Sequence, residues 1–216
     1  MKVLAAPGPV SYPVIVNNKG IELSFAKEGN ADVVLDSTVS LAKRGLKIHY
    51  VTVKGLMTVY PTVGRKIGVP KMLTAANVLA RALVDIKKLN AEVIVIDDIQ
   101  KIMESLKKSE IDSAVVPSGV AKGITFEELL GIPGSCGAHI KPQFRDQFVS
   151  LYNEGVDMFK QDPEGFATKV VNTVRELAKV NITKEFVINV MKNSTFKVEE
   201  LPDDEEFVKL VRKYAN

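Results

Sequence analysis

The chain has 216 residues, with 29 basic and 26 acidic side chains and a formal net charge of +3. Hydrophobic residues make up 46% and charged residues 25% of the chain, proportions typical of a folded globular protein rather than a disordered one. The balanced charge excludes the strongly basic footprint of a nucleic-acid binder, so we expect no nucleic-acid partner. The length allows one large domain or two small lobes.

The composition also bears on metals, cofactors and membranes. One cysteine excludes an internal disulfide and a multi-cysteine zinc site, and two histidines are too few for a histidine cage. The chain contains neither GxGxxG nor a P-loop, so we expect no metal and no nucleotide cofactor. Pro7, Pro9 and Pro13 interrupt the apolar start, which does not fit a signal peptide. No apolar run reaches about 18 residues, so we expect a cytoplasmic protein without membrane insertion.

The first third of the chain alternates short apolar runs with helix-start signals. Ser11 is expected to cap a helix that runs from Tyr12 to about Asn18, and Ser37 a helix that Gly45 ends. The predicted strands of this part are Lys2–Ala6, Ile21–Ala26, Asp32–Leu35 and Lys47–Val53.

A second series repeats this order. Thr74 is expected to cap a long helix to about Leu89, and Asp98 a helix that carries Ile102 and Leu106. The predicted strands here are Lys66–Val69, Glu92–Ile96 and Ser113–Val116. They are continuous apolar runs, as buried parallel strands show. Two series of the same build predict an α/β fold with two lobes.

The last part of the chain is predominantly helical after one returning strand, Ser135–Ile140. We therefore assign residues 1–65 and about 141–216 to lobe one with C-terminal helices, and residues 66–133 to lobe two. Residues 134–140 are the expected crossover strand. Two crossovers between lobes permit hinge closure around a ligand.

Polar side chains cluster where predicted strands end and helices begin. In open α/β sheets, ligands bind outside the carboxyl ends of the strands. Helix N-termini also offer free N–H groups to a carboxylate or phosphate. Each hydroxyl taken alone is more simply a helix cap, but two lobes that face each other with such ends predict a cleft. The candidate ligand-binding residues are Ser11, Tyr12, Asp36, Ser37, Thr38, Thr74, Ala75, Pro117 and Ser118.

Two other pairs carry reactive groups but favour a structural interpretation. Cys136 and His139 lie in one predicted strand at a spacing that points them to opposite faces. A nucleophile and its base need to approach within about 3 Å, so we expect a buried cysteine beside an incidental histidine. Asp97 and Asp98 are adjacent and diverge in direction, and Asp98 serves as a helix cap. No catalytic residue is assigned.

Three stretches resemble type II periplasmic-binding-protein-like domains. KVLAAPGPVSYPVIVNNKG is similar to the first strand and helix of that fold. Lys66-IGVPKMLTAANVLARAL-Val84 with AEVIVIDDIQKIMESLKKSEIDSAVV resembles its second lobe, and FVSLYNEGVDMFKQDPEGFATKVV its C-terminal helices. The resemblance covers most of the chain. It implies a two-lobed α/β fold with a ligand-binding cleft and a C-terminal helical segment.

Within that superfamily, the nearest suggested relatives are chorismate dehydratase and 1,4-dihydroxy-6-naphthoate synthase of menaquinone biosynthesis, together with small prokaryotic proteins of the same build. The Thr-Thr-Ala at the helix start of these enzymes is matched in part by Leu73-Thr74-Ala75. The naphthoate synthase has a catalytic histidine after the strand that ends here at Val116, where this chain has Pro117-Ser118. That departure removes the expected general base.

Three functions follow as hypotheses. The first is a cytosolic binding protein for a small, anionic, carboxylate-bearing molecule, with Asp36 as an acceptor for a ligand hydroxyl or amine. The second is a lyase or synthase of the menaquinone-precursor kind, in which Asp36 is the base. The third is a regulatory or interaction module whose cleft is vestigial, because residues 21–35 leave little room for the usual strand and helix. Catalysis stays open among these, and a homodimer is compatible with the sequence.

Overall fold

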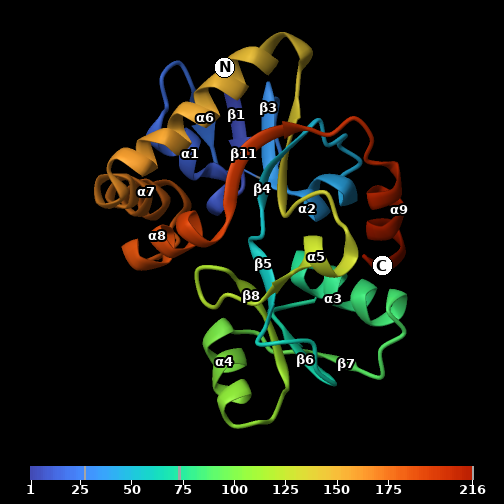
Figure 1. Cartoon of the computed structure of the whole chain (residues 1–216). Helices are drawn as coiled ribbons and strands as arrows, with labels where there is room; N and C mark the ends of the chain where they lie inside the picture. The colour runs from blue at the N-terminus through green and yellow to red at the C-terminus, as the bar shows by residue number, and fades with distance from the viewer. Residues whose placement is uncertain (27, 73, 216) are drawn as a thin grey trace.

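The computed structural model describes residues 1–26, 28–72 and 74–215. These residues form two lobes, each built on its own mixed β-sheet with helices against it (Figure 1). The α/β, two-lobed architecture expected from the sequence is confirmed. Within the described residues, no helix is long and apolar enough to cross a membrane.

The first sheet has six strands in the order β11-β4-β10-β3-β1-β2. Strand β1 is parallel to β2 and β3, whereas β10 is antiparallel to β3 and β4, and β11 is antiparallel to β4. Their bounds are β1 (Lys2–Ala5), β2 (Glu22–Ser24), β3 (Val33–Ser37), β4 (Tyr50–Lys54), β10 (Cys136–Ile140) and β11 (Thr195–Glu200).

The second sheet has five strands in the order β7-β6-β8-β5-β9. Strand β6 is parallel to β7 and β8, and β5 is antiparallel to β8 and β9. Their bounds are β5 (Met57–Tyr60), β6 (Lys66–Val69), β7 (Glu92–Val95), β8 (Ser113–Pro117) and β9 (Ile124–Thr125).

The helices cover both faces of the first sheet because its strands alternate. Val3 and Ala5 of β1 pack into the cluster that holds α1, α6 and α7, whereas Leu4 between them packs on the side of α2 and α9. The helices are α1 (Tyr12–Val16), α2 (Thr38–Lys43), α3 (Ala75–Ile86), α4 (Ile99–Lys107), α5 (Phe126–Leu130), α6 (Arg145–Gln161), α7 (Pro163–Ala178), α8 (Lys184–Asn193) and α9 (Glu205–Tyr214).

Helix starts follow the predicted caps in most places. The side chains of Ser37, Thr74 and Asp98 each accept a hydrogen bond from a backbone N–H in the first turn of their helices. Ser11 does not act in this way, contrary to expectation. It ends a short 3-10 helix with helical angles of its own (φ −89°, ψ −14°), and its hydroxyl donates to the Gly8 carbonyl at 2.8 Å.

The chain crosses between the sheets at Gly55-Leu56 and returns through residues 131–135. One carboxylate oxygen of Glu127 joins the two crossings, since it accepts hydrogen bonds from the Gly55 N–H (2.8 Å) and the Ser135 hydroxyl (3.0 Å). The expected change of lobe at residue 66 differs from the strand pairing, because β5 already belongs to the second sheet. The expected crossover strand 134–140 contains β10, which pairs in the first sheet.

The C-terminal helix α9 contacts both lobes (Figure 1). It packs against α2 of the first lobe and α3 of the second. Asp204, just before it, accepts a hydrogen bond from the Ile48 N–H at 2.8 Å. At its other end Arg81 donates to the Tyr214 carbonyl at 3.0 Å, and the Tyr214 hydroxyl donates to Asp85. A single apolar cluster therefore runs from the first lobe through α9 into the second.

Candidate functional site

A hollow lies between the two lobes where the first turns of α2 and α3 face each other. Its volume is about 370 Å³. Ser37, Ser40, Lys43 and Arg44 line it from α2 and its flanking residues, together with Val39, and Thr74 and Ala75 line it from the start of α3. None of these described lining residues is a carboxylate. The wall carries two cations and three hydroxyl groups.

A second hollow adjoins the first and shares Ser40 and Arg44 with it. It has a volume of about 480 Å³ and lies against the ends of β1 and β3 and the segment after β2. Apolar side chains dominate its wall, including Leu4, Val34 and Phe25. Together the two hollows extend from the inter-lobe cleft to the face of the first sheet.

Asp36 organises the wall between these hollows. One of its carboxylate oxygens accepts a hydrogen bond from the Ser37 N–H at 2.7 Å, and the other accepts from the Ser40 hydroxyl at 2.6 Å. Arg44 Nη1 lies 3.5 Å from that second oxygen. Asp36 thereby fixes the first turn of α2 and holds the Arg44 guanidinium at the rim that both hollows share.

The α3 side of the cleft presents mainly backbone. The Thr74 hydroxyl accepts from the Asn77 N–H at 3.4 Å, and its proton reaches the carbonyl oxygens of Pro70 (2.9 Å) and Lys71 (3.1 Å). The first N–H groups of a helix have no intrahelical partner. At this end of the twelve-residue α3, the groups that remain for a ligand are therefore backbone N–H groups rather than the Thr74 hydroxyl.

The structure brings together four of the nine predicted site residues. Ser37, Thr74 and Ala75 line the hollow between α2 and α3, and Asp36 lines the adjoining one. Thr38 lies beside them but is 1% exposed, and its hydroxyl donates to the Gly134 carbonyl at 2.7 Å. It ties α2 to the returning crossover. Leu73, quoted in the resemblance, lies outside the described residues.

The other four predicted site residues lie away from these hollows. Ser11 and Tyr12 are buried against the core of the first lobe, and burial raises the pKa of the Tyr12 phenol. Pro117 ends β8, and the Ser118 hydroxyl lies 2.6 Å from that of Ser194, beside the first crossover. The first two residues therefore have a structural role in the core, and the last two have one beside the crossover.

Sequence reasoning missed Ser40, Lys43 and Arg44, which complete the cleft wall. They follow Ser37 at helical spacing, so they fall on the face of α2 that Ser37 begins. Extending the candidate site along the helix period from each predicted cap would have found them.

Two further reactive groups singled out in the sequence are Cys136 and His139. Cys136 is buried, and burial raises the pKa of its thiol, which keeps it in the unreactive protonated form. His139 Nδ1 lies 2.8 Å from the Lys47 carbonyl. This arrangement favours the structural interpretation of both residues. In the part of the chain that the structure describes, no three His, Cys, Asp or Glu side chains converge on a metal position.

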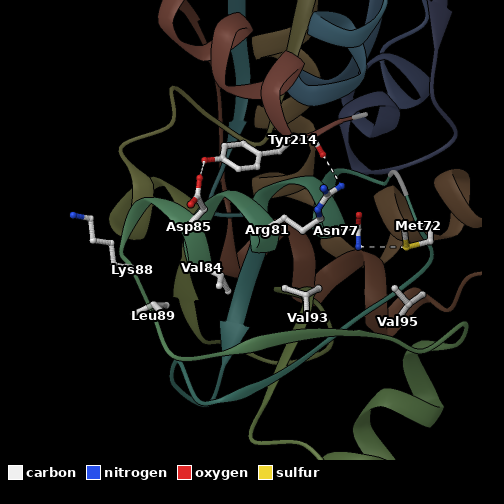
Figure 2. Close-up of a pocket in the computed structure, with 10 residues that line it drawn as sticks. All are labelled: Met72, Asn77, Arg81, Val84, Asp85, Lys88, Leu89, Val93, Val95 and Tyr214. Atoms are coloured by element: carbon white, nitrogen blue, oxygen red, sulfur yellow. Dashed lines mark hydrogen bonds between the residues drawn. The ribbon is translucent and has the colours of Figure 1, made fainter.

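A larger hollow, of about 750 Å³, lies outside the cleft between α3 and β7 (Figure 2). Val84 and Leu89 line it from the side of α3, and Val93 and Val95 from β7, while Met72 stands at one end. The Tyr214 hydroxyl and Asp85 close its upper rim. Its wall combines these apolar side chains with Asn77, Arg81, Asp85 and Lys88.

The strand orders, the two crossovers and the cleft define the class of type II periplasmic-binding-protein-like folds. The chain belongs to the family described as Protein of unknown function (DUF3834), whose model matches residues 1–197. Among curated proteins, no sequence match was found.

Solved structures share this fold at low sequence identity. A candidate nitrate transport protein from Thermoplasma volcanium is similar with a TM-score of 0.76 and 24% identity, over 100% of this chain and 92% of the other. The periplasmic aliphatic sulphonate binding protein SsuA from Escherichia coli has a TM-score of 0.66 and 11% identity, over 100% and 85%. An ABC transporter structure from Parabacteroides distasonis has a TM-score of 0.67 and 11% identity, over 99% and 92%. At these identities the similarity establishes the fold alone.

Proposed function

We propose that this protein binds a small anionic molecule in the cleft between α2 and α3. The observation that carries the proposal is the cleft wall, where Lys43 and Arg44 stand with the Ser37 hydroxyl opposite the start of α3, and where the described lining residues include no carboxylate. Cations, hydroxyl donors and the N–H groups of a helix start are the groups that bind carboxylate, sulfonate and nitrate oxygens.

The hydrogen-bonding state of the wall agrees with an acceptor-rich ligand. The Ser37 oxygen already accepts from the Ser40 N–H at 3.0 Å, so its hydroxyl proton is the part left for a ligand. Arg44 contacts Asp36 only at 3.5 Å, so several of its N–H donors are available to a ligand at the shared rim. Structures with this fold include a sulphonate-binding protein and a candidate nitrate transport protein. Both names refer to small oxyanions.

Binding can be measured by calorimetry and thermal shift with nitrate, ethanesulfonate, acetate and benzoate. We expect at least one of these anions to bind and raise the melting temperature. Lys43→Gln should then weaken binding about tenfold or more, because a hydrogen bond to a charged group contributes about 1.5–3 kcal/mol.

Lys47→Gln is the matched control, since Lys47 is exposed on the same lobe but outside the cleft hollow. It should leave the affinity unchanged. Equal effects of the two substitutions would show that binding reflects overall charge rather than the cleft. If none of the anions binds at millimolar concentration, the proposal fails and a vestigial cleft becomes the better interpretation.

The lyase or synthase alternative stays a prediction. Both oxygens of its candidate base, Asp36, already accept hydrogen bonds within the chain, which favours a positioning role for this carboxylate. Turnover of chorismate or of a cyclic futalosine derivative by the purified protein would establish the enzymatic function. The cytoplasmic location is likewise part of the proposal, and fractionation of cells that express the native gene tests it.

A further inference from the structure

Strand β7 is an open edge of the second sheet. Among the described strands only β6 pairs with it. The Glu92 N–H donates to the Arg65 carbonyl at 2.8 Å, and the Ile96 N–H to the Val69 carbonyl at 2.9 Å. Because successive backbone groups of a strand point to opposite sides, the N–H and C=O groups of Val93 and Val95 point away from β6. These groups can therefore form backbone hydrogen bonds with another strand.

Beyond Glu92 at its start, the side chains of this edge include no charge and no proline. Edge strands commonly carry an inward-pointing charge, a proline or a bulge. Here the run Val93-Ile94-Val95-Ile96 consists entirely of β-branched apolar residues. Val95 is 37% exposed and the neighbouring Met72 is 60% exposed. Both line the hollow beneath α3, toward which Val93 and Val95 rise from β7 (Figure 2).

Opposite charges flank the two ends of the strand. Lys87 and Lys88 precede it, Asp97 and Asp98 follow it, and all four are exposed. An antiparallel copy of the same strand brings each lysine pair beside the aspartate pair of the other copy. A parallel copy sets like charges side by side, which is unfavourable. The edge is therefore complementary to itself in the antiparallel direction.

We propose that two copies of this chain form a symmetric dimer through antiparallel pairing of their β7 strands. The register centred on the outward-facing Val93 sets this residue against Val93 of the second copy, which brings the start of each β7 beside the end of the other. The outward N–H and C=O groups of Val93 then form a hydrogen-bonded pair across the axis. An isologous contact of this kind closes with two copies.

The dimer also covers the hollow between α3 and β7. A two-fold axis perpendicular to the joined sheet places α3 of both copies on the same face. The two hollows between α3 and β7 then adjoin, and Val95 and Met72 of each copy lose exposed surface. Neither β7 nor this hollow contributes to the cleft between α2 and α3. The failure of one proposal, dimer or anion binding, therefore leaves the other unaffected.

Sedimentation velocity on the full chain, over protein concentrations from 1 to about 200 µM, tests the proposal. We expect the mass to approach twice the 23.6 kDa of one chain as the concentration rises. Val95→Lys places a charge on the paired edge and should keep the protein monomeric throughout. Leu177→Lys is the matched control, because Leu177 is an exposed apolar residue of α7 on the other lobe, and it should dimerise like the wild type. A monomeric wild type, or a dimeric Val95→Lys, overturns the proposal.

Two further variants test the register. Lys88→Asp and Asp97→Lys should each raise the dimer dissociation constant about fivefold, and the double variant should restore it, since the swap re-creates opposite charges. Asp97 is chosen because Asp98 caps α4 through the Gln100 N–H. Val93→Cys should form an intermolecular disulfide on mild oxidation, because Cα atoms of a hydrogen-bonded pair lie about 5.5 Å apart. Val95→Cys should not. A double variant no better than the singles, or the reverse cysteine pattern, overturns this register.

Discussion

At the scale of single residues, His49 shows how the fold selects a protonation state. The Ile140 N–H donates to His49 Nδ1 at 3.0 Å, which requires that nitrogen to be unprotonated. The His139 ring lies 4.8 Å away between centroids. Burial, then the His139, Arg145 and Lys47 charges, lower the pKa of His49, while Asp204 opposes them. The folded chain therefore favours the neutral imidazole.

This preference predicts an acid-sensitive stability. In the unfolded chain His49 regains an ordinary pKa of 6.5, so the unfolded state binds more protons just below that pH. The contribution of His49 to the free energy of unfolding should thus be complete above pH 6.5. It should be lost as the pH falls toward the lower pKa of the folded state. Urea unfolding followed by circular dichroism between about pH 7.5 and 5.5 measures it, because carboxylates titrate mainly below this range.

His49→Gln is the informative variant, because it removes the titrating group. It should flatten the pH dependence in this range. A wild type whose unfolding midpoint is unchanged from pH 7.5 to about 5.5 would contradict the assignment.

At the scale of elements, local signals were predictable and long-range pairings were not. Ser37 and Thr74 were predicted as caps because a cap depends only on its own first helical turn. Strand β11 was missed, although Phe196 and Val198 alternate with charged residues, because that period-two pattern sits among helices. The lobe of β5 was misassigned because its partner β8 lies far along the chain, with Val59 opposite Val115.

In the candidate site, too, local features were predictable and features that depend on long-range packing were not. The hydroxyls of Ser37 and Thr74 were placed at the cleft from strand ends alone. Ser11 lies in a 3-10 turn and is buried against the first lobe, whereas Ser118 is buried beside Ser194, which is distant in the sequence. A strand end thus predicts a position near the cleft but does not predict whether its side chain reaches the solvent.

The contact between α1 and α6 gives a prediction at this scale. A Cβ at Gly155 would lie 2.3 Å from the Pro13 carbonyl oxygen, a backbone atom that cannot turn aside. Gly155→Ala gains about 1 kcal/mol of helix propensity, but overpacking a helix contact costs about 1–3 kcal/mol. We expect the variant to be less stable, with a lower midpoint of urea unfolding.

Gly8→Ala serves as the control, since a Cβ there meets no atom within 4 Å and its φ of −127° suits any residue. It should leave the midpoint unchanged or raise it slightly. A Gly155→Ala protein more stable than the wild type would show that the two helices separate at little cost.

At the scale of the whole molecule, α9 packs against both lobes. Phe207 and Val211 lie in the apolar cluster that reaches both lobes, and the bonds to Asp204 and Tyr214 fasten the two ends of the helix. The lobes are thus joined at α9 as well as at the two hinge crossings. Opening of the cleft between α2 and α3 requires α9 to shift on one of these two helices.

Tyr214 is the residue with which to test this coupling. Tyr214→Ala should lower the free energy of unfolding by about 3 kcal/mol, because it removes a buried aromatic ring from the cluster. Tyr214→Phe keeps the ring, loses only the hydroxyl bond to Asp85 and should cost about 1 kcal/mol. Urea unfolding measures both. The wild type should unfold in one transition, and equal losses in the two variants would show that the ring contributes nothing to the contact between lobes.

The strand order of the two sheets also dictates the sequence of events during synthesis. The second sheet is formed by one continuous stretch, from β5 to β9, so all its strands have been synthesised once Thr125 is added. The first sheet cannot be completed then, since β4 pairs with β10 and β11, which both follow the second sheet in the sequence. Non-local pairing of this kind is slow because the chain loses the entropy of loop closure before the stabilising contacts form. We therefore expect the second lobe to serve as the folded platform on which the nascent first lobe closes.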